Sequence, residues 1–278
     1  MTYFGFLAWF LGPPLLLLVG LTWLDHQRGR VLPLSLRSWP ATFVLLAHVI
    51  VAVLYTTPWD NYLVATGVWW YNPKLVTGVV FGWVPIEEYT FFVLQTVLMG
   101  LWIIFLARRL APINNTTSVA PRPFIRWAAT ALIGAIWLAS LVLLLSDWQP
   151  GTYLGLILVW ALVPITLQMA LGGDILWRYR RLVFWSLVPA TLYLGLGDGL
   201  AIRSGTWTVD PAQSTGLFLG SLPLEEFIFF LVTNTLIVFG MILVLAQESQ
   251  TRAPKAVLNT LHRMATPRNV GTQTISHS

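Results

Sequence analysis

Two short segments place adjacent carboxyl groups inside long apolar stretches. The segment "VPIEEYTFFVLQ" (84–95) holds Glu87 and Glu88, and "LPLEEFIFFLVT" (222–233) holds Glu225 and Glu226. A carboxylate is costly to place in apolar surroundings, and a carboxyl group kept from water favours its protonated form. Four such groups near one interface would hold several protons at neutral pH, and a buried protonated carboxyl can serve as a general acid. The sequence therefore predicts acid–base chemistry in a dry site.

The surroundings of the glutamates repeat as well. Aromatic rings stabilise cations in dry sites, and they follow each pair at Tyr89, Phe91, Phe92, Phe227, Phe229 and Phe230. Pro85 and Pro223 stand two residues before the first glutamate of each pair. A proline inside a helix removes a backbone hydrogen bond, so we expect a kink there that opens a cavity at membrane depth.

Adjacent positions on a helix point in different directions, about 100° apart. Glu88 therefore shares a face with Phe91, Phe92 and Gln95, whereas Glu87 does not. One glutamate of each pair could act on a substrate while the other forms a hydrogen bond across an interface. The sequence leaves open which glutamate is the acid and which the base.

The chain that positions these residues is a membrane protein by composition. Its 278 residues are 56% hydrophobic and 10% charged, with a mean hydropathy of +0.72, whereas a soluble domain carries about 25% charge. A span takes roughly 20 apolar residues, and seven stretches qualify, near residues 3–24, 40–57, 76–106, 127–146, 152–171, 182–200 and 215–246. The third and seventh are overlong, so we expect them to tilt or project, with Glu87 near the bilayer midplane.

The basic residues predict how the chain is oriented. They follow the first, third, fifth and seventh spans, at Arg28, Arg30, Arg37, Arg108, Arg109, Arg122, Arg126, Arg178, Arg180, Arg181, Arg252, Lys255, Arg263 and Arg268. The opposite side carries Lys74 and Arg203. The positive-inside rule then places the N-terminus outside the cell membrane and the C-terminus in the cytoplasm. The net charge of +5 is explained by loops beside anionic lipid, so no nucleic-acid partner is expected.

The chain matches itself when it is shifted by 138 residues. Asp60 falls on Asp198, and the ungapped register continues through both motifs to Phe92 and Phe230. This predicts an all-α polytopic membrane protein with two parallel three-span repeats, residues 1–110 and 151–247, related by an axis along the membrane normal. Residues 111–150, with the fourth span, would link them, and residues 248–278 would form a disordered cytoplasmic tail.

The doubled Pro-x-Glu-Glu motif, with Asp60 and Trp69 before one copy and Asp198 and Trp207 before the other, resembles the membrane-integral, non-flavin lycopene (carotenoid) cyclases. The resemblance covers residues 1–246 and is closest to the fused single-chain form without a phytoene synthase domain. It implies a membrane-dissolved linear carotenoid as substrate and closure of its ψ end groups to β rings, giving γ-carotene or β-carotene. It implies no metal, flavin or other cofactor. It marks as motif positions Pro85, Glu87, Glu88, Pro223, Glu225 and Glu226.

Two other readings are weighed against this one. Seven spans arranged as three, one and three also describe small proton-coupled transporters, although the spans hold few Asn, Gln or Ser residues beside the glutamates. A retinal protein is excluded because Lys74 and Lys255, the two lysines of the chain, lie outside the spans. We expect Asp60, Asp198, Trp69 and Trp207 to order loops at the outer membrane edge, and His48 to be an interior residue. The sequence leaves open the ring type, the substrate length, and whether there are one or two active centres.

Overall fold

The computed structural model describes residues 1–110 and 122–252. Within these ranges seven helical segments are long and apolar enough to cross a membrane, as predicted. The first combines α1 and α2, and the others are single helices. Their bounds are α1 (Tyr3–Phe10), α2 (Gly12–Gln27), α3 (Ala41–Ala65), α4 (Ile86–Leu110), α5 (Pro123–Leu145), α6 (Thr152–Arg178), α7 (Arg180–Arg203) and α8 (Leu224–Leu245). The protein is therefore an all-α, multi-pass membrane protein.

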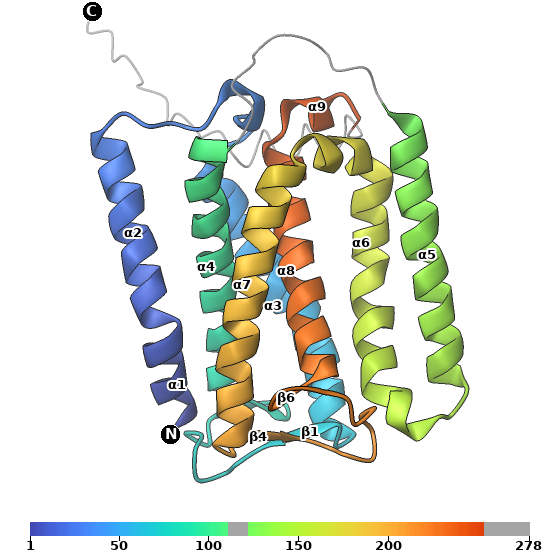
Figure 1. Cartoon of the computed structure of the whole chain (residues 1–278). Coiled ribbons are helices and arrows are strands. Elements are labelled where there is room, and N and C mark those ends of the chain that lie inside the picture. The colour runs from blue at the N-terminus through green and yellow to red at the C-terminus, as the bar shows by residue number, and fades with distance from the viewer. Residues whose placement is uncertain (111–121, 253–278) are drawn as a thin grey trace, which may run out of the picture.

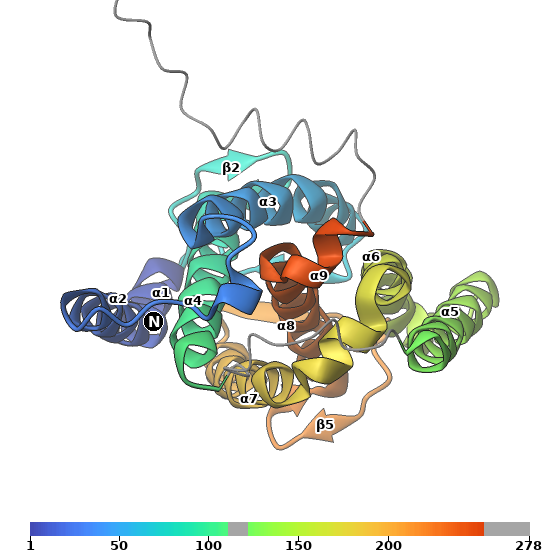
Figure 2. The same cartoon turned by 90° about the horizontal axis from the view of Figure 1, so that it is seen from above.

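The helices run roughly antiparallel to their chain neighbours (Figure 1). Seen along their axes, α8 lies near the centre and is surrounded by α3, α4, α7 and α6, all of which it contacts (Figure 2). The outer helices α2 and α5 pack on α4 and α6, respectively. The α4 and α8 helices carry the glutamate pairs, so the bundle places both pairs in its interior.

One end of the bundle is held by ion pairs of arginine. Asp25 at the end of α2 binds Arg109 (2.8 Å) and Arg108 (3.2 Å) of α4. On the other side, Asp174 of α6 binds Arg252 (2.6 Å) beyond the short helix α9 (Gln247–Gln250). The first residues of the predicted disordered tail are therefore ordered, because they dock on α6; residues 253–278 lie outside the described part of the chain. Two 3₁₀ turns, Leu34–Leu36 and Gln149–Gly151, lie in loops.

The third and seventh spans begin later than predicted. Strands β2 (Val80–Phe81) and β3 (Val84–Pro85) form a hairpin before α4, and β5 (Phe218–Leu219) and β6 (Leu222–Pro223) form one before α8. Each hairpin turns at a glycine with a φ of 68°, Gly82 or Gly220, a conformation that glycine adopts without strain. The overlong, tilted helices are therefore wrong: these apolar residues form hairpins and not helix.

The same hairpins overturn two further predictions. Pro85 ends strand β3, and Pro223 directly precedes α8, so neither proline kinks a helix. Glu87 lies in the first turn of α4, and Glu225 in the first turn of α8, instead of midway along a span. The glutamates thus lie near the end of the bundle that carries the hairpins.

Two further strands connect the halves of the chain at that end. Strand β1 (Trp69–Tyr71) pairs antiparallel with β4 (Trp207–Val209), so that Tyr71 lies opposite Trp207. Figure 1 shows this pair at the same end as the N-terminus, next to the starts of α4 and α8. The pair brings aromatic side chains from both halves to the glutamates.

Candidate functional site

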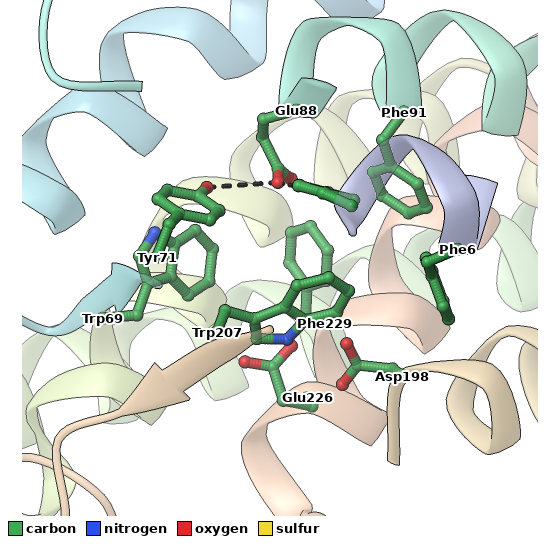
Figure 3. Close-up of a pocket in the computed structure, with 10 residues that line it drawn as sticks. Phe6, Trp69, Tyr71, Glu88, Phe91, Asp198, Trp207, Glu226 and Phe229 are labelled. Atoms are coloured by element: carbon green, nitrogen blue, oxygen red, sulfur yellow. Dashed lines mark hydrogen bonds between the residues drawn. The ribbon is translucent and has the colours of Figure 1, made fainter. Parts of the chain in front are cut away.

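Glutamates from both motifs line one small cavity. Glu88 begins α4 and Glu226 begins α8, and both side chains are buried, with 7% and 3% of their surface exposed. The cavity they share has a volume of about 30 Å³. We term it the acid chamber; its lining residues are Tyr3, Phe6, Trp69, Tyr71, Glu88, Phe91, Asp198, Trp207, Glu226 and Phe229 (Figure 3).

Tyrosine hydroxyls hold these two glutamates. The Tyr3 hydroxyl donates a hydrogen bond of 2.5 Å to Oε2 of Glu88, and the Tyr71 hydroxyl donates to the same oxygen at 3.1 Å. The Tyr153 hydroxyl donates to Oε1 of Glu226 at 2.8 Å. Glu88 therefore accepts two phenol donors, whereas Glu226 accepts one.

Tyr71 lies in strand β1, outside the spans. Burial, and then the nearby carboxyl groups of Asp60 and Glu88, raise the pKa of the Tyr71 phenol well above its usual value. The phenol thus keeps its proton at physiological pH and remains a donor to Glu88.

The other glutamate of each pair faces a loop. Glu87 accepts a 2.6 Å hydrogen bond from the backbone N–H of Thr77. Glu225 accepts bonds of the same length from the backbone N–H and the hydroxyl of Thr215. These bonds fix the segment that leads into each hairpin, so the two members of each pair have different surroundings.

Two aspartates add to the buried carboxyl groups. Asp198 lines the acid chamber, where Figure 3 shows its carboxyl group beside that of Glu226. The Trp207 side chain is hydrogen-bonded to Asp198, whose Oδ2 has no partner among the described residues. Asp60 is 1% exposed, and both of its carboxyl oxygens are likewise unpartnered in the described part of the chain. Both aspartates lie within helices α7 and α3 and not in the loops where they were predicted, although the Trp207 contact does connect α7 to a strand.

The predicted aromatic residues divide into several groups. Phe91 and Phe229 line the chamber, together with Trp69 and Trp207. The Phe230 ring packs edge-on against Phe91, with the ring centroids 6.1 Å apart. These rings bring apolar walls to within contact of the carboxyl groups.

Other predicted residues lie outside the chamber. Tyr89 donates to the carbonyl of Phe81 at 2.9 Å and so holds the first hairpin. Phe227 lies beside Gly195 of α7. Gln95 donates to Oδ1 of Asn234 at 3.1 Å and connects α4 with α8. Phe92 faces a second, much larger cavity.

That larger cavity measures about 460 Å³ and lies among α3, α4, α6 and α8. Its walls are mostly apolar, and Gln95, His48 and Gln168 are among the few polar side chains that face it. Phe229 lines both this cavity and the acid chamber. A hydrophobic molecule held in the larger cavity would therefore lie next to the acid chamber.

Sequence reasoning missed the tyrosines that bind the glutamates. Tyr3 and Tyr153 each stand two residues before a glycine, Gly5 or Gly155, so that a second repeat signal was present. Its spacing of 150 residues differs from the 138 of the motifs, because the connecting loops differ in length. Tyr71 had no such signal, since Val209 occupies the corresponding position.

Comparison with known proteins places the chain in a family. The profile of the lycopene cyclase family matches residues 2–110 and 150–245. A lycopene beta-cyclase of Halobacterium salinarum is 39% identical over 247 residues, which cover 87% of this chain and 95% of that protein. A bifunctional lycopene cyclase/phytoene synthase of Podospora anserina is 38% identical over 200 residues, covering 69% of this chain and 33% of that protein. A protein of the same name from Phaeosphaeria nodorum is 37% identical over 209 residues, covering 72% of this chain and 35% of that protein.

No solved structure matches the chain. The family match favours an enzyme over the alternative of a transporter. It spans both glutamate motifs and the helices that carry them. The chain belongs to the lycopene cyclase family.

Proposed function

We propose that this enzyme closes the ψ end groups of lycopene to β rings by acid catalysis in the acid chamber. The observation that carries the proposal is that Glu88 and Glu226, one from each motif, line a single cavity with Asp198 among aromatic rings. The names of its relatives supply the substrate and the ring type. The chamber supplies a proton donor, a proton acceptor and walls that exclude water.

The reaction is a balanced isomerisation. A carboxyl proton adds to the terminal double bond and leaves a tertiary cation at the carbon with two methyl groups. The internal double bond attacks this carbon and closes the ring, and loss of a ring proton to a carboxylate forms the new double bond. No electrons are transferred, so the proposed reaction needs neither flavin nor nicotinamide.

The geometry supports a division of roles between Glu88 and Glu226. Hydrogen-bond donors stabilise a carboxylate, and Glu88 accepts two of them, from Tyr3 and Tyr71. We assign Glu88 as the base. Glu226 lies beside Asp198 (Figure 3), and two adjacent carboxyl groups favour keeping a proton between them. We assign Glu226, with Asp198, as the acid.

The aromatic walls protect the cation. Water inside the chamber would quench it, and the free volume of about 30 Å³ leaves little room for water once an end group is bound. The faces of Trp207, Phe91 and Phe229 offer π electrons to the positive charge. In this proposal Glu87 and Glu225 position the hairpins through Thr77 and Thr215 and do not touch the substrate.

The two-repeat organisation belongs to the same proposal. Several contacts of the first half recur in the second. The Tyr3 N–H donates to the carbonyl of Leu75 (2.8 Å), and the Tyr153 N–H donates to that of Gln213 (3.0 Å). Leu75 and Gln213 stand 138 residues apart. These paired contacts support two parallel units with the linker helix α5 between them.

A test of the function uses a bacterium that accumulates lycopene. Expression of the full chain is expected to convert lycopene to monocyclic and bicyclic pigments with β rings, as measured by pigment chromatography and mass spectrometry. The Glu226→Gln variant, expressed at an equal level, serves as the control. Unchanged lycopene with the wild-type chain present in the membrane would contradict the proposed function.

The orientation of the chain in the cell membrane is a further proposal. Arginines gather at the end of the bundle where α2, α4 and α6 finish, and the N-terminus lies at the other end (Figure 1). We expect a reporter fused after residue 252 to be cytoplasmic and one fused at the N-terminus to be external. Alkaline phosphatase and green fluorescent protein fusions measure this, and a cytoplasmic N-terminus would contradict it.

A further inference from the structure

The acid chamber is far too small for a whole carotenoid, so the rest of the substrate needs a second space. The 460 Å³ cavity meets this need, because Phe229 lines both cavities. On α8 its lining extends from Phe229 to Val244, about 22 Å at the helical rise of ~1.5 Å per residue. That is most of the ~30 Å hydrocarbon thickness of a bilayer. The cavity therefore suits a long, straight apolar chain that lies along the helices.

The cavity also reaches the outer surface of the bundle. Val51 of α3 lines it and is 61% exposed, and Tyr55 one turn further is also exposed. The rings of Tyr55 and Trp160 stack across α3 and α6, 5.4 Å apart. This opening faces outward from the helices, so a lipid-dissolved molecule could enter sideways.

The 138-residue register pairs each wall of this cavity with a position in the other half of the molecule. Gly240 of α8 corresponds to Trp102 of α4, and Ala47 of α3 corresponds to Trp185 of α7. The Trp102 indole reaches across to α7 and donates a 3.1 Å hydrogen bond to the carbonyl of Trp185. A large side chain thus bridges α4 and α7, where the corresponding place between α8 and α3 holds a glycine.

A second bridge joins α7 and α8. Asn234 is fully buried and donates a 3.1 Å hydrogen bond to Thr191 of α7. The corresponding residues of the first half are Thr96 and Val53. Thr96 donates to the carbonyl of Phe92 in its own helix, and it lines the large cavity. The side of the bundle around α7 is therefore held closed by cross-helix contacts that its counterpart around α3 lacks.

From these contacts we infer that the enzyme has one polyene channel, the cavity among α3, α4, α6 and α8, and that both ends of the substrate are cyclised through it in turn. This inference rests on the proposed function. The linear chain occupies the channel while its end group lies in the acid chamber. A product with two rings then requires release and a second binding event with the chain reversed, so that the monocyclic carotenoid is a free intermediate.

The test places in the channel the residue found at its counterpart position. Gly240→Trp and Ala47→Phe fill the channel without touching the acid chamber. Both variants are expected to lose monocyclic and bicyclic products together, by about 10²-fold for Gly240→Trp, because the end group no longer reaches its position. Gly20→Trp is the matched control, since a side chain at this α2 position meets open space. Its activity is expected to equal that of the wild type.

The assay uses purified protein in liposomes with lycopene, with the folded fraction measured by thermal unfolding. A Cβ at Gly240 would lie 2.4 Å from Nε2 of His48, so His48 must move in that variant. If Gly240→Trp does not fold, the result for Ala47→Phe decides. Full activity in a folded variant, or loss of the bicyclic product alone with normal monocyclic product, would overturn the single channel. An inactive wild type would instead contradict the proposed function.

Discussion

Replacement of Glu226 or Glu88 by glutamine is expected to lower the cyclisation rate by roughly 10²–10⁴-fold, the usual contribution of general acid–base catalysis. Glutamine keeps the size of the side chain and can accept the tyrosine hydrogen bond, yet it neither gives nor takes a proton. Glu226→Gln would remove the proposed acid, and Glu88→Gln the proposed base. The initial rate of pigment formation by purified enzyme in liposomes measures both effects.

Two comparisons separate chemistry from folding. Glu248→Gln lies in α9, where the side chain pairs with Arg178 far from the chamber along the helix, and it is expected to leave the rate unchanged. Glu87→Gln and Glu225→Gln keep an acceptor for the loop N–H and are expected to cause smaller losses than their neighbours. Full activity of both Glu88→Gln and Glu226→Gln would mean that the acid lies elsewhere.

Much of the fold could be predicted from the sequence because hydropathy measures burial in lipid directly. All seven spans were located, since each carries enough apolar residues in succession. The boundaries of the third and seventh were wrong for the same reason. Val79, Val80 and Phe81 are as apolar as the helix that follows, so hydropathy does not separate an exposed apolar hairpin from a helix. Gly82, with its positive φ, was the residue that signalled the turn.

The site could be predicted in composition but not in arrangement. The repeated motif identified the four glutamates, and the resemblance identified the family. Which glutamate faces the chamber depends on where the helix begins, because one residue changes the direction by about 100°. Tyr3 and Tyr71 reach Glu88 from distant parts of the chain, through the packing of α1 and the pairing of β1 with β4. Such long-range contacts leave little trace in a single sequence.

Cyclisation in heavy water is expected to place a single deuterium in the product for each ring formed. The proposed acid must regain its proton after each turnover, and exchange with solvent supplies it. The chamber lies at the hairpin end of the bundle, where the starts of α4 and α8 are close to the surface loops. The label is expected on the carbon next to the one that bears two methyl groups, because that carbon receives the proton in the first step. Mass spectrometry and NMR of the purified pigment measure its amount and position.

The same experiment is run with enzyme freed of nucleotides, with no flavin or nicotinamide added. A balanced isomerisation transfers no electrons, so the rate is expected to be equal with and without reduced flavin. A product without label would mean that the proton taken by Glu88 returns to Glu226 inside the chamber, which the shared cavity would allow. A strict requirement for reduced flavin would contradict the mechanism, because these carboxyl groups would then be insufficient to start the reaction.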